Sequence, residues 1–248
     1  MYEFTLTANQ KNQKLISFIF NSLKPHITNL GGIIVTDISF GKQNVCLAVD
    51  PSYCEQIKGV IGQVVAEAIV YYYKFDYLAS SINLGITNSA AHNSFVQALV
   101  VFDKQTDKDI ITSSLSLEHR LVVDSFYEFR LGALRERWEQ IVSVVMESIP
   151  ILLKDRSVDE LTRYFVDSSG GNASEVNLYV DSCSVTVDIG EDKQPLTFDT
   201  TSDYQTDLVC EIISLSPKKI IIHGQASVAQ SIEAALSSVF YGKIYIAN

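Results

Sequence analysis

The chain has 248 residues, of which 47% are hydrophobic and 19% are charged, a composition typical of folded globular proteins and unlike that of disordered chains. Its formal net charge is -10 at pH 7, so its surface repels a phosphate backbone and we expect no nucleic-acid partner. The most apolar stretches, residues 60–73 and 141–153, are too short to cross a bilayer and each contains a glutamate, so we expect no membrane span.

The first 50 residues predict a β-α-β-β unit. Residues 2–7 alternate between polar and apolar side chains, as a strand does. Residues 11–30 then have apolar side chains at helical spacing, interrupted by Pro25. Two strand-like runs, 33–40 and 45–49, flank Gly41 and predict a hairpin.

The middle of the chain, to about Leu153, has helical periodicity. The spacing of Ser52 and Glu55 predicts a capping box at its start. The best-marked helix is expected to kink or end at Pro150. Its core-facing stripe consists of Leu134, Trp138, Ile141, Val145 and Ile149. Turn-forming residues predict breaks at 83–85, 88, 106–107 and 112–116.

The last third predicts a second α/β unit. Ser157 and Glu160 form another capping-box signal. The expected elements after that helix are strands at 175–180, 184–189 and 196–198, a helix at 202–215, a strand at 218–223, a helix from Ser227 and a strand at 243–247. The fold class is therefore mixed α/β, with a helical middle flanked by an N-terminal β-α-β-β unit and a C-terminal β-β-α-β-α-β unit. The two α/β ends can form separate lobes or share one sheet, and the best-marked boundary divides residues 1–115 from residues 116–248.

One candidate ligand site follows the strand at 218–223. Its Ile220-Ile221-Ile222 run indicates burial on both faces. His223 ends the strand where open α/β sheets place their ligands, and Gly224 leads to Ser227 at a helix N-terminus, which can hold an anion. The alternative is structural: Gly224 turns the chain and Ser227 caps the helix.

Two arginines are candidates to complete this site as an anion clamp. Arg163 lies four residues from both Asp159 and Asp167, a spacing that predicts a helical ion-pair ladder, and Tyr164-Phe165-Val166 beside it is typical of core. Arg130 belongs to a segment in which arginines alternate with glutamates. That pattern is typical of a solvated, ion-paired helix face rather than of a phosphate-binding patch.

The chain shows no assembled catalytic or metal-binding motif. No GxSxG, HExxH or Cys–His signature is present, so we assign no catalytic residue, no metal ligand and no cofactor. Cys46, Cys54, Cys183 and Cys210 form no CxxC pair and are expected to be buried reduced thiols. Together with an N-terminal segment that lacks an apolar signal-peptide core, this indicates a cytoplasmic protein.

An aromatic segment predicts a docking surface for a second copy or a protein partner. It lies within residues 60–101, where the chain has Tyr71, Tyr72, Tyr73, Phe75, Tyr77 and Phe95. Not all of these side chains need fit one core, and a large exposed apolar patch usually marks an interface.

Two stretches together resemble the YtxC-like family of sporulation proteins from endospore-forming bacteria. The first is Glu128-Phe129-Arg130-Leu131, followed by Trp138 and by Leu161–Val166; the second is Leu215–His223. The resemblance covers roughly residues 117–246 and implies a role in sporulation, but it implies no reaction or cofactor. We therefore expect a cytoplasmic, non-catalytic sporulation protein. The alternatives are a small-molecule or nucleotide-binding protein with an anion site near His223, and an interaction module that docks through its helical middle.

Overall fold

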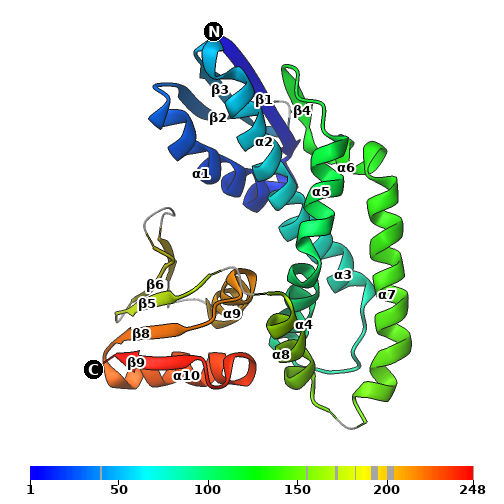
Figure 1. Cartoon of the computed structure of the whole chain (residues 1–248), viewed down its shortest axis with the longest axis vertical. Helices are drawn as coiled ribbons and strands as arrows, with labels where there is room; N and C mark the ends of the chain where they lie inside the picture. The colour runs from blue at the N-terminus through cyan, green and yellow to red at the C-terminus, as the bar shows by residue number, and fades with distance from the viewer. Residues whose placement is uncertain are drawn as a thin grey trace. The chain divides into compact units, whose positions relative to one another are not determined.

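The structure is a computed structural model that describes residues 1–39, 41–154, 156–170, 173–181, 183–190, 195–199 and 204–247. The chain forms two compact units that interleave in sequence (Figure 1). The first comprises Met1–Leu78 and Lys104–Ser143, and the second comprises Ala79–Asp103 and Val144–Asn248. The single boundary between residues 115 and 116 stays a prediction.

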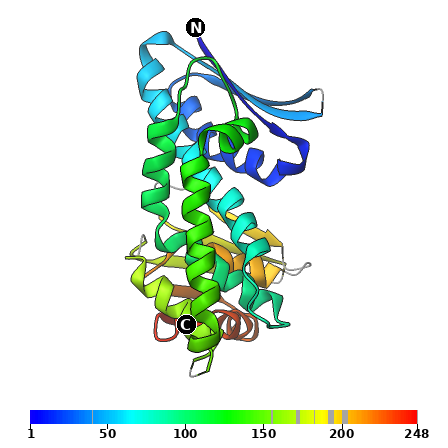
Figure 2. The ribbon, with the colours of Figure 1, turned by 90° about the vertical axis from the view of Figure 1, so that its right-hand side faces the viewer.

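The first unit contains a mixed sheet with the strand order β2-β3-β1-β4. Its strands, and the helix between the first two, are β1 (Tyr2–Asn9), α1 (Gln13–Asn29), β2 (Ile33–Ser39), β3 (Lys42–Val49) and β4 (Arg120–Val122). The predicted β-α-β-β start is confirmed, and α1 lies beside the β2–β3 hairpin (Figure 2). The short strand β4, which pairs parallel with β1, was not predicted.

Helices complete the first unit. They are α2 (Cys54–Ala68), the π-helix η3 (Ile69–Lys74), α3 (Phe75–Ser81), α5 (Lys104–Ser114), α6 (Val123–Arg130) and α7 (Gly132–Leu152), of which α3 and α7 continue into the second unit. The predicted capping box at Ser52 is wrong, because Asp50 Oδ1 accepts the hydrogen bond from the Ser52 N–H at 2.9 Å and Glu55 pairs with Lys58. The predicted break at 106–107 is also wrong, since α5 runs through it.

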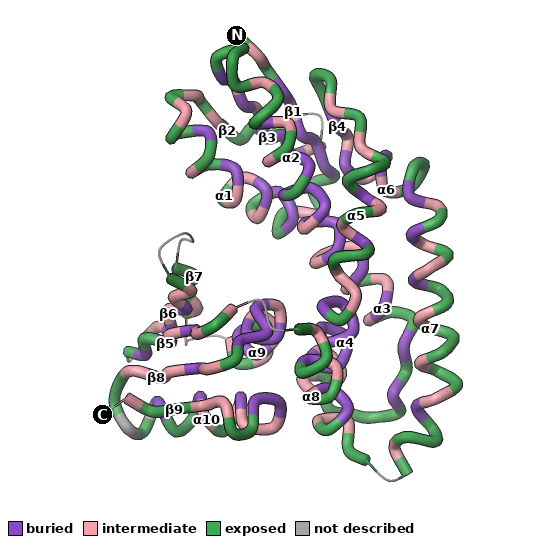
Figure 3. Tube along the Cα trace, viewed as in Figure 1, coloured by how far each residue is buried: buried purple, intermediate pink, exposed green. Residues whose placement is uncertain are grey.

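α7 is a long helix with few buried side chains, as the mostly green tube in Figure 3 shows. Of the predicted stripe, Leu134, Trp138 and Ile149 are buried, whereas Ile141 and Val145 are only half-buried. Pro150 lies inside the helix, which ends two residues later at Leu152. The predicted stripe and helix end are thus correct in part.

The second unit contains a mixed sheet with the strand order β7-β6-β5-β8-β9. Its elements are α4 (Ser89–Phe102), α8 (Val158–Ser168), β5 (Val176–Val180), β6 (Ser184–Asp188), β7 (Leu196–Asp199), α9 (Tyr204–Leu215), β8 (Ile220–Gly224), α10 (Ala226–Phe240) and β9 (Ile244–Ala247). The capping box of α8 and the C-terminal order of elements are confirmed. Ser202, the predicted start of α9, lies outside the described residues.

Only one face of this second sheet is packed against the core. Ile220 and Ile222 of β8 are fully buried among side chains of α9 and α10. On the opposite face Ile221 is half-buried, and Tyr179 of the neighbouring strand is exposed. β8 is an interior strand with parallel neighbours on both sides, but the predicted burial of both its faces is wrong.

Candidate functional site

His223 is held against β5 by two contacts. Its ring stacks on the Tyr179 ring with centroids 4.7 Å apart and an angle of 13° between the planes. Its Nε2 lies 2.9 Å from Asn177 Oδ1, within hydrogen-bond distance. Gly224 follows with φ +150° and packs directly on the Val180 backbone. This arrangement fixes the histidine ring on the open face of the sheet.

The structure does not bring Arg163 to His223. Arg163 Nη2 donates to the Ser238 carbonyl at 2.7 Å, and its guanidinium lies over the Tyr241 ring. Those partners lie at the C-terminal end of α10, whereas Ser227 lies in its first turn, roughly 15–20 Å away at 1.5 Å per residue. Arg130 is exposed on α6, in the other unit.

The structural roles predicted beside this site also differ in detail. Asp167 pairs with Lys243 at 2.6 Å, and Arg163 bonds to the Ser238 carbonyl. Neither contact is the ion pair between Arg163 and Asp167 that the helical spacing predicted. Ser227 is not the N-cap of α10; Gln225 is, and its side chain makes no capping hydrogen bond. The contacts of Arg163 therefore fix α8 to α10.

A buried ionic cluster in the first unit was missed. Lys74 Nζ lies 2.6 Å from Asp107 Oδ2, and both side chains are completely buried. Trp138 Nε1 donates to the same carboxylate oxygen at 3.1 Å, and Arg137 Nε lies 3.3 Å from Oδ1. Arg137, which lies in the same run of alternating arginines and glutamates as Arg130, thus reaches into the unit, whereas that run was predicted to form a solvated face. The cluster joins η3, α5 and α7.

The sequence did contain a signal for this cluster. Val70, Lys74 and Leu78 follow one another at intervals of four and all three are buried, so Lys74 lies on the inward stripe of its helix. Asp107 is likewise buried and lies four residues before buried Ile111 on α5. A charged residue on an inward helical stripe indicates a buried partner of opposite charge.

The tyrosines of the predicted aromatic docking segment pack within the first unit, whereas Phe95 packs against Phe165 in the second. Tyr73 lies against Tyr127 with ring centroids 4.4 Å apart, and the Trp138 ring lies near both Tyr127 and Tyr77. The Tyr73 hydroxyl donates to Asp124 Oδ1 at 2.6 Å. Burial, with the charge and hydrogen bond of Asp124, holds the pKa of this hydroxyl well above its usual value. The three tyrosine rings are half-buried and Trp138 is fully buried, so these rings form no open docking surface.

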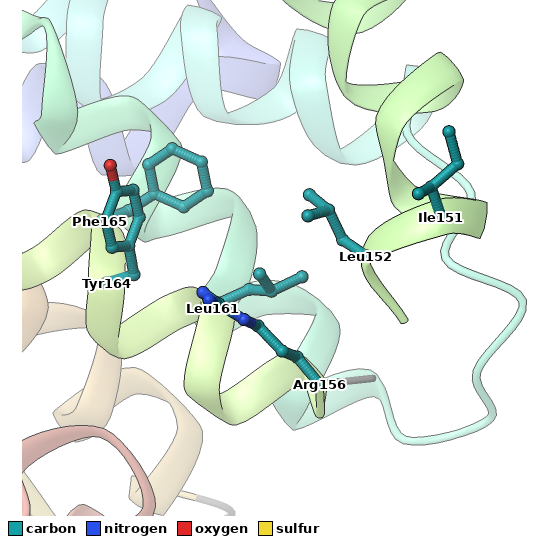
Figure 4. A pocket seen from close by; sticks show the side chains of 6 residues that line it. All are labelled: Ile151, Leu152, Arg156, Leu161, Tyr164 and Phe165. Carbon is teal, nitrogen blue, oxygen red and sulfur yellow. The ribbon is translucent and has the colours of Figure 1, made fainter. Parts of the chain in front are cut away.

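Exposed apolar side chains gather instead in a groove of the second unit, between the end of α7 and α8. The groove has a volume of about 540 Å³ and is lined by Ile151, Leu152, Arg156, Leu161, Tyr164 and Phe165. Figure 4 shows Tyr164 and Phe165 on one side, Ile151 and Leu152 on the other, and Leu161 and Arg156 between them. Only part of the run Tyr164–Val166, which was predicted to be core, is buried: Val166 is buried, whereas Tyr164 is 57% exposed.

Contacts with α4 hold one side of the groove in place, and an arginine lies among the residues that line it. Phe165 makes edge-to-face contacts with Phe95 and Phe102 of α4, at centroid distances of 5.9 and 5.3 Å. These contacts hold its ring in place. Among the lining residues that the structure describes, Arg156 is the one charged side chain, and it is exposed. The surface suits an apolar segment that also presents a carboxylate.

The cysteines differ in accessibility, contrary to the prediction that all are buried. Cys183 is exposed in the turn between β5 and β6, whereas Cys46, Cys54 and Cys210 are partly buried thiols. Burial, with the nearby charges of Asp207 and Glu211, raises the pKa of Cys210 to about 12.

We expect iodoacetamide at pH 8 to label Cys183 well before Cys210, because the thiolate is the reacting species and Cys210 stays protonated far above that pH. Peptide mass spectrometry measures the rates, and protein unfolded in urea, in which all four thiols should react, is the control. Equal rates for the two thiols in folded protein would contradict the burial of Cys210.

Within the described part of the chain, no three His, Cys, Asp or Glu residues cluster as metal ligands would. None of the helices described there is long and apolar enough to span a membrane. In comparisons with known proteins, the model of the YtxC-like family matches residues 86–245. Neither the curated proteins nor the solved structures gave a match. The matched residues include α4, α8 and the whole groove.

Proposed function

The chain belongs to the YtxC-like family, and from this membership we propose that it acts in sporulation as a cytoplasmic binding protein without catalytic activity. Its groove between α7 and α8 binds a protein partner. The association of the family with endospore-forming bacteria supports the setting. The observation that carries the binding role is the groove itself, a concave apolar surface of about 540 Å³.

The exposure of the groove residues supports binding rather than core packing. Ile151 is 67% exposed and Leu152 is 39% exposed, although both are large and apolar. Contiguous apolar surface of this kind is costly in water and usually marks a docking site. The partner that fits is an amphipathic helix whose apolar face fills the groove and whose acidic residue reaches Arg156.

We expect deletion of the gene in its native host to lower the yield of heat-resistant spores, and Tyr164→Asp to lower it toward the deletion level. Aspartate at this position would have to be desolvated when the partner binds, and it would repel the partner's acidic residue. The matched control is Phe129→Asp, because Phe129 is also an exposed aromatic residue but lies on α6 in the other unit.

Colony counts after heat treatment measure the yield, and circular dichroism of the purified variants confirms that each folds. A deletion strain with normal spore yield would exclude the sporulation role. An impaired deletion strain combined with a normal Tyr164→Asp strain would exclude the groove as the functional surface.

A further inference from the structure

β2 is an edge strand, and no other strand of the described residues pairs with its outer side. It lies at the end of the strand order β2-β3-β1-β4, and none of its seven residues is buried (Figure 3). Ile33 and Ile38 are each 63% exposed and Val35 is 50% exposed. The strand contains one charged residue, Asp37, and no proline or lysine. Soluble proteins usually block such an edge with charges, prolines or bulges.

We propose that two copies of the chain pair through β2, antiparallel and related by a two-fold axis, so that their sheets join into one continuous sheet. Each strand satisfies the backbone groups that the other leaves open to water. A two-fold axis perpendicular to the sheet leaves the side chain of each residue on the same face of the sheet in both copies. Residues that pair across two strands must also share a face, so the axis must pass between two copies of the same residue. The register that pairs all seven residues of β2 places this axis at Thr36.

This register is self-complementary, which favours a second copy over an unrelated strand. It sets Ile34 of one copy opposite Ile38 of the other, on the same face of the sheet as Thr36. Cross-strand pairs of β-branched side chains are favourable. Asp37 lies opposite Val35 of the other copy, so the charge of each strand does not directly face its equivalent. A register centred on Asp37 would place two carboxylates opposite each other.

The oligomeric state tests the proposal. Light scattering after gel filtration and sedimentation equilibrium of the full chain should give the mass of two copies. The variant Ile33→Lys/Ile38→Lys puts a cation on each face of the edge and should raise the dimer dissociation constant at least about tenfold. Both side chains are exposed, so folding should be preserved. Phe129→Lys, an exposed apolar side chain away from the edge, should leave the constant unchanged.

The register is tested by oxidative cross-linking. Thr36→Cys places two thiols opposite each other at the axis, within the span of a disulfide, and should give a linked dimer whose peptide contains residue 36 from both copies. Asp37→Cys places them about 8 Å apart on a diagonal and should not. A monomeric chain at all concentrations, or a dimer unaffected by the lysine variant, would overturn the proposal. Cross-linking at residue 37 but not at 36 would overturn the register.

Discussion

Replacing Asp107 by alanine is expected to lower the free energy of unfolding by about 3–5 kcal/mol. The Asp107 carboxylate is completely buried, lies 2.6 Å from Lys74 Nζ and accepts a hydrogen bond from Trp138 Nε1. Without it, the Lys74 ammonium would remain in a low-dielectric interior without this carboxylate partner, and the indole N–H would lose its acceptor. Breaking one side of a buried ion pair is therefore far more costly than removing a surface charge.

Two further variants separate the ion pair from its surroundings. Asp109→Ala removes an exposed carboxylate from the same helix and should change the free energy of unfolding by less than about 0.5 kcal/mol. Lys74→Met/Asp107→Leu removes both charges and should recover part of the loss, since apolar residues can replace a buried pair. Urea unfolding followed by fluorescence reports on this unit directly, because Trp138 is the only tryptophan of the chain. Circular dichroism is the second probe. Equal stability of Asp107→Ala and Asp109→Ala would mean that the cluster does not hold the three helices together.

The sequence predicted most elements whose signals are local. The alternation in β1, the capping box of α8 and the αβα order around β8 each depend on neighbouring residues, and each is present in the structure. Local signals were wrong where packing outweighed them. α1 continues through Pro25 because Leu23 and Ile27 on either side of it are buried. The short strand β4 gains its stability from pairing with β1, more than 100 residues away in sequence, so three residues alone could not indicate it.

The candidate site was less predictable because exposure depends on distant contacts. Tyr164, Phe165 and Val166 are equivalent as a sequence run, but α8 turns Val166 inward and leaves Tyr164 in water. Likewise, Arg163 and His223 were both plausible ligand residues, yet Arg163 bonds to Ser238 near the C-terminal end of α10, whereas His223 bonds to Asn177 of β5. Spacing along one helix shows which residues share a face. It does not show which face will be covered.

Gly224→Ala is expected to lower the free energy of unfolding by roughly 2–4 kcal/mol, from steric displacement and backbone strain together. A Cβ atom at this position would lie 2.4 Å from the Val180 carbonyl oxygen and 3.1 Å from Val180 Cβ. The obstructing atoms belong to the paired strand β5, so relief would require separation of β5 from β8. The φ of +150° adds strain for any residue with a side chain.

The matched control is Gly242→Ala, which isolates the steric term. Gly242 lies in the same unit and also has a positive φ, +78°, but a Cβ there would meet no atom within 4 Å. Gly242→Ala should lower the free energy of unfolding only by the strain of an alanine in the left-handed conformation, about 1 kcal/mol. Thermal and urea unfolding followed by circular dichroism measure both variants. If Gly224→Ala were as stable as Gly242→Ala, the strand contact would not explain the glycine, and the close approach of a ligand beside His223 would become the better explanation. A large difference between the two variants would instead establish Gly224 as the point where β8 packs on β5.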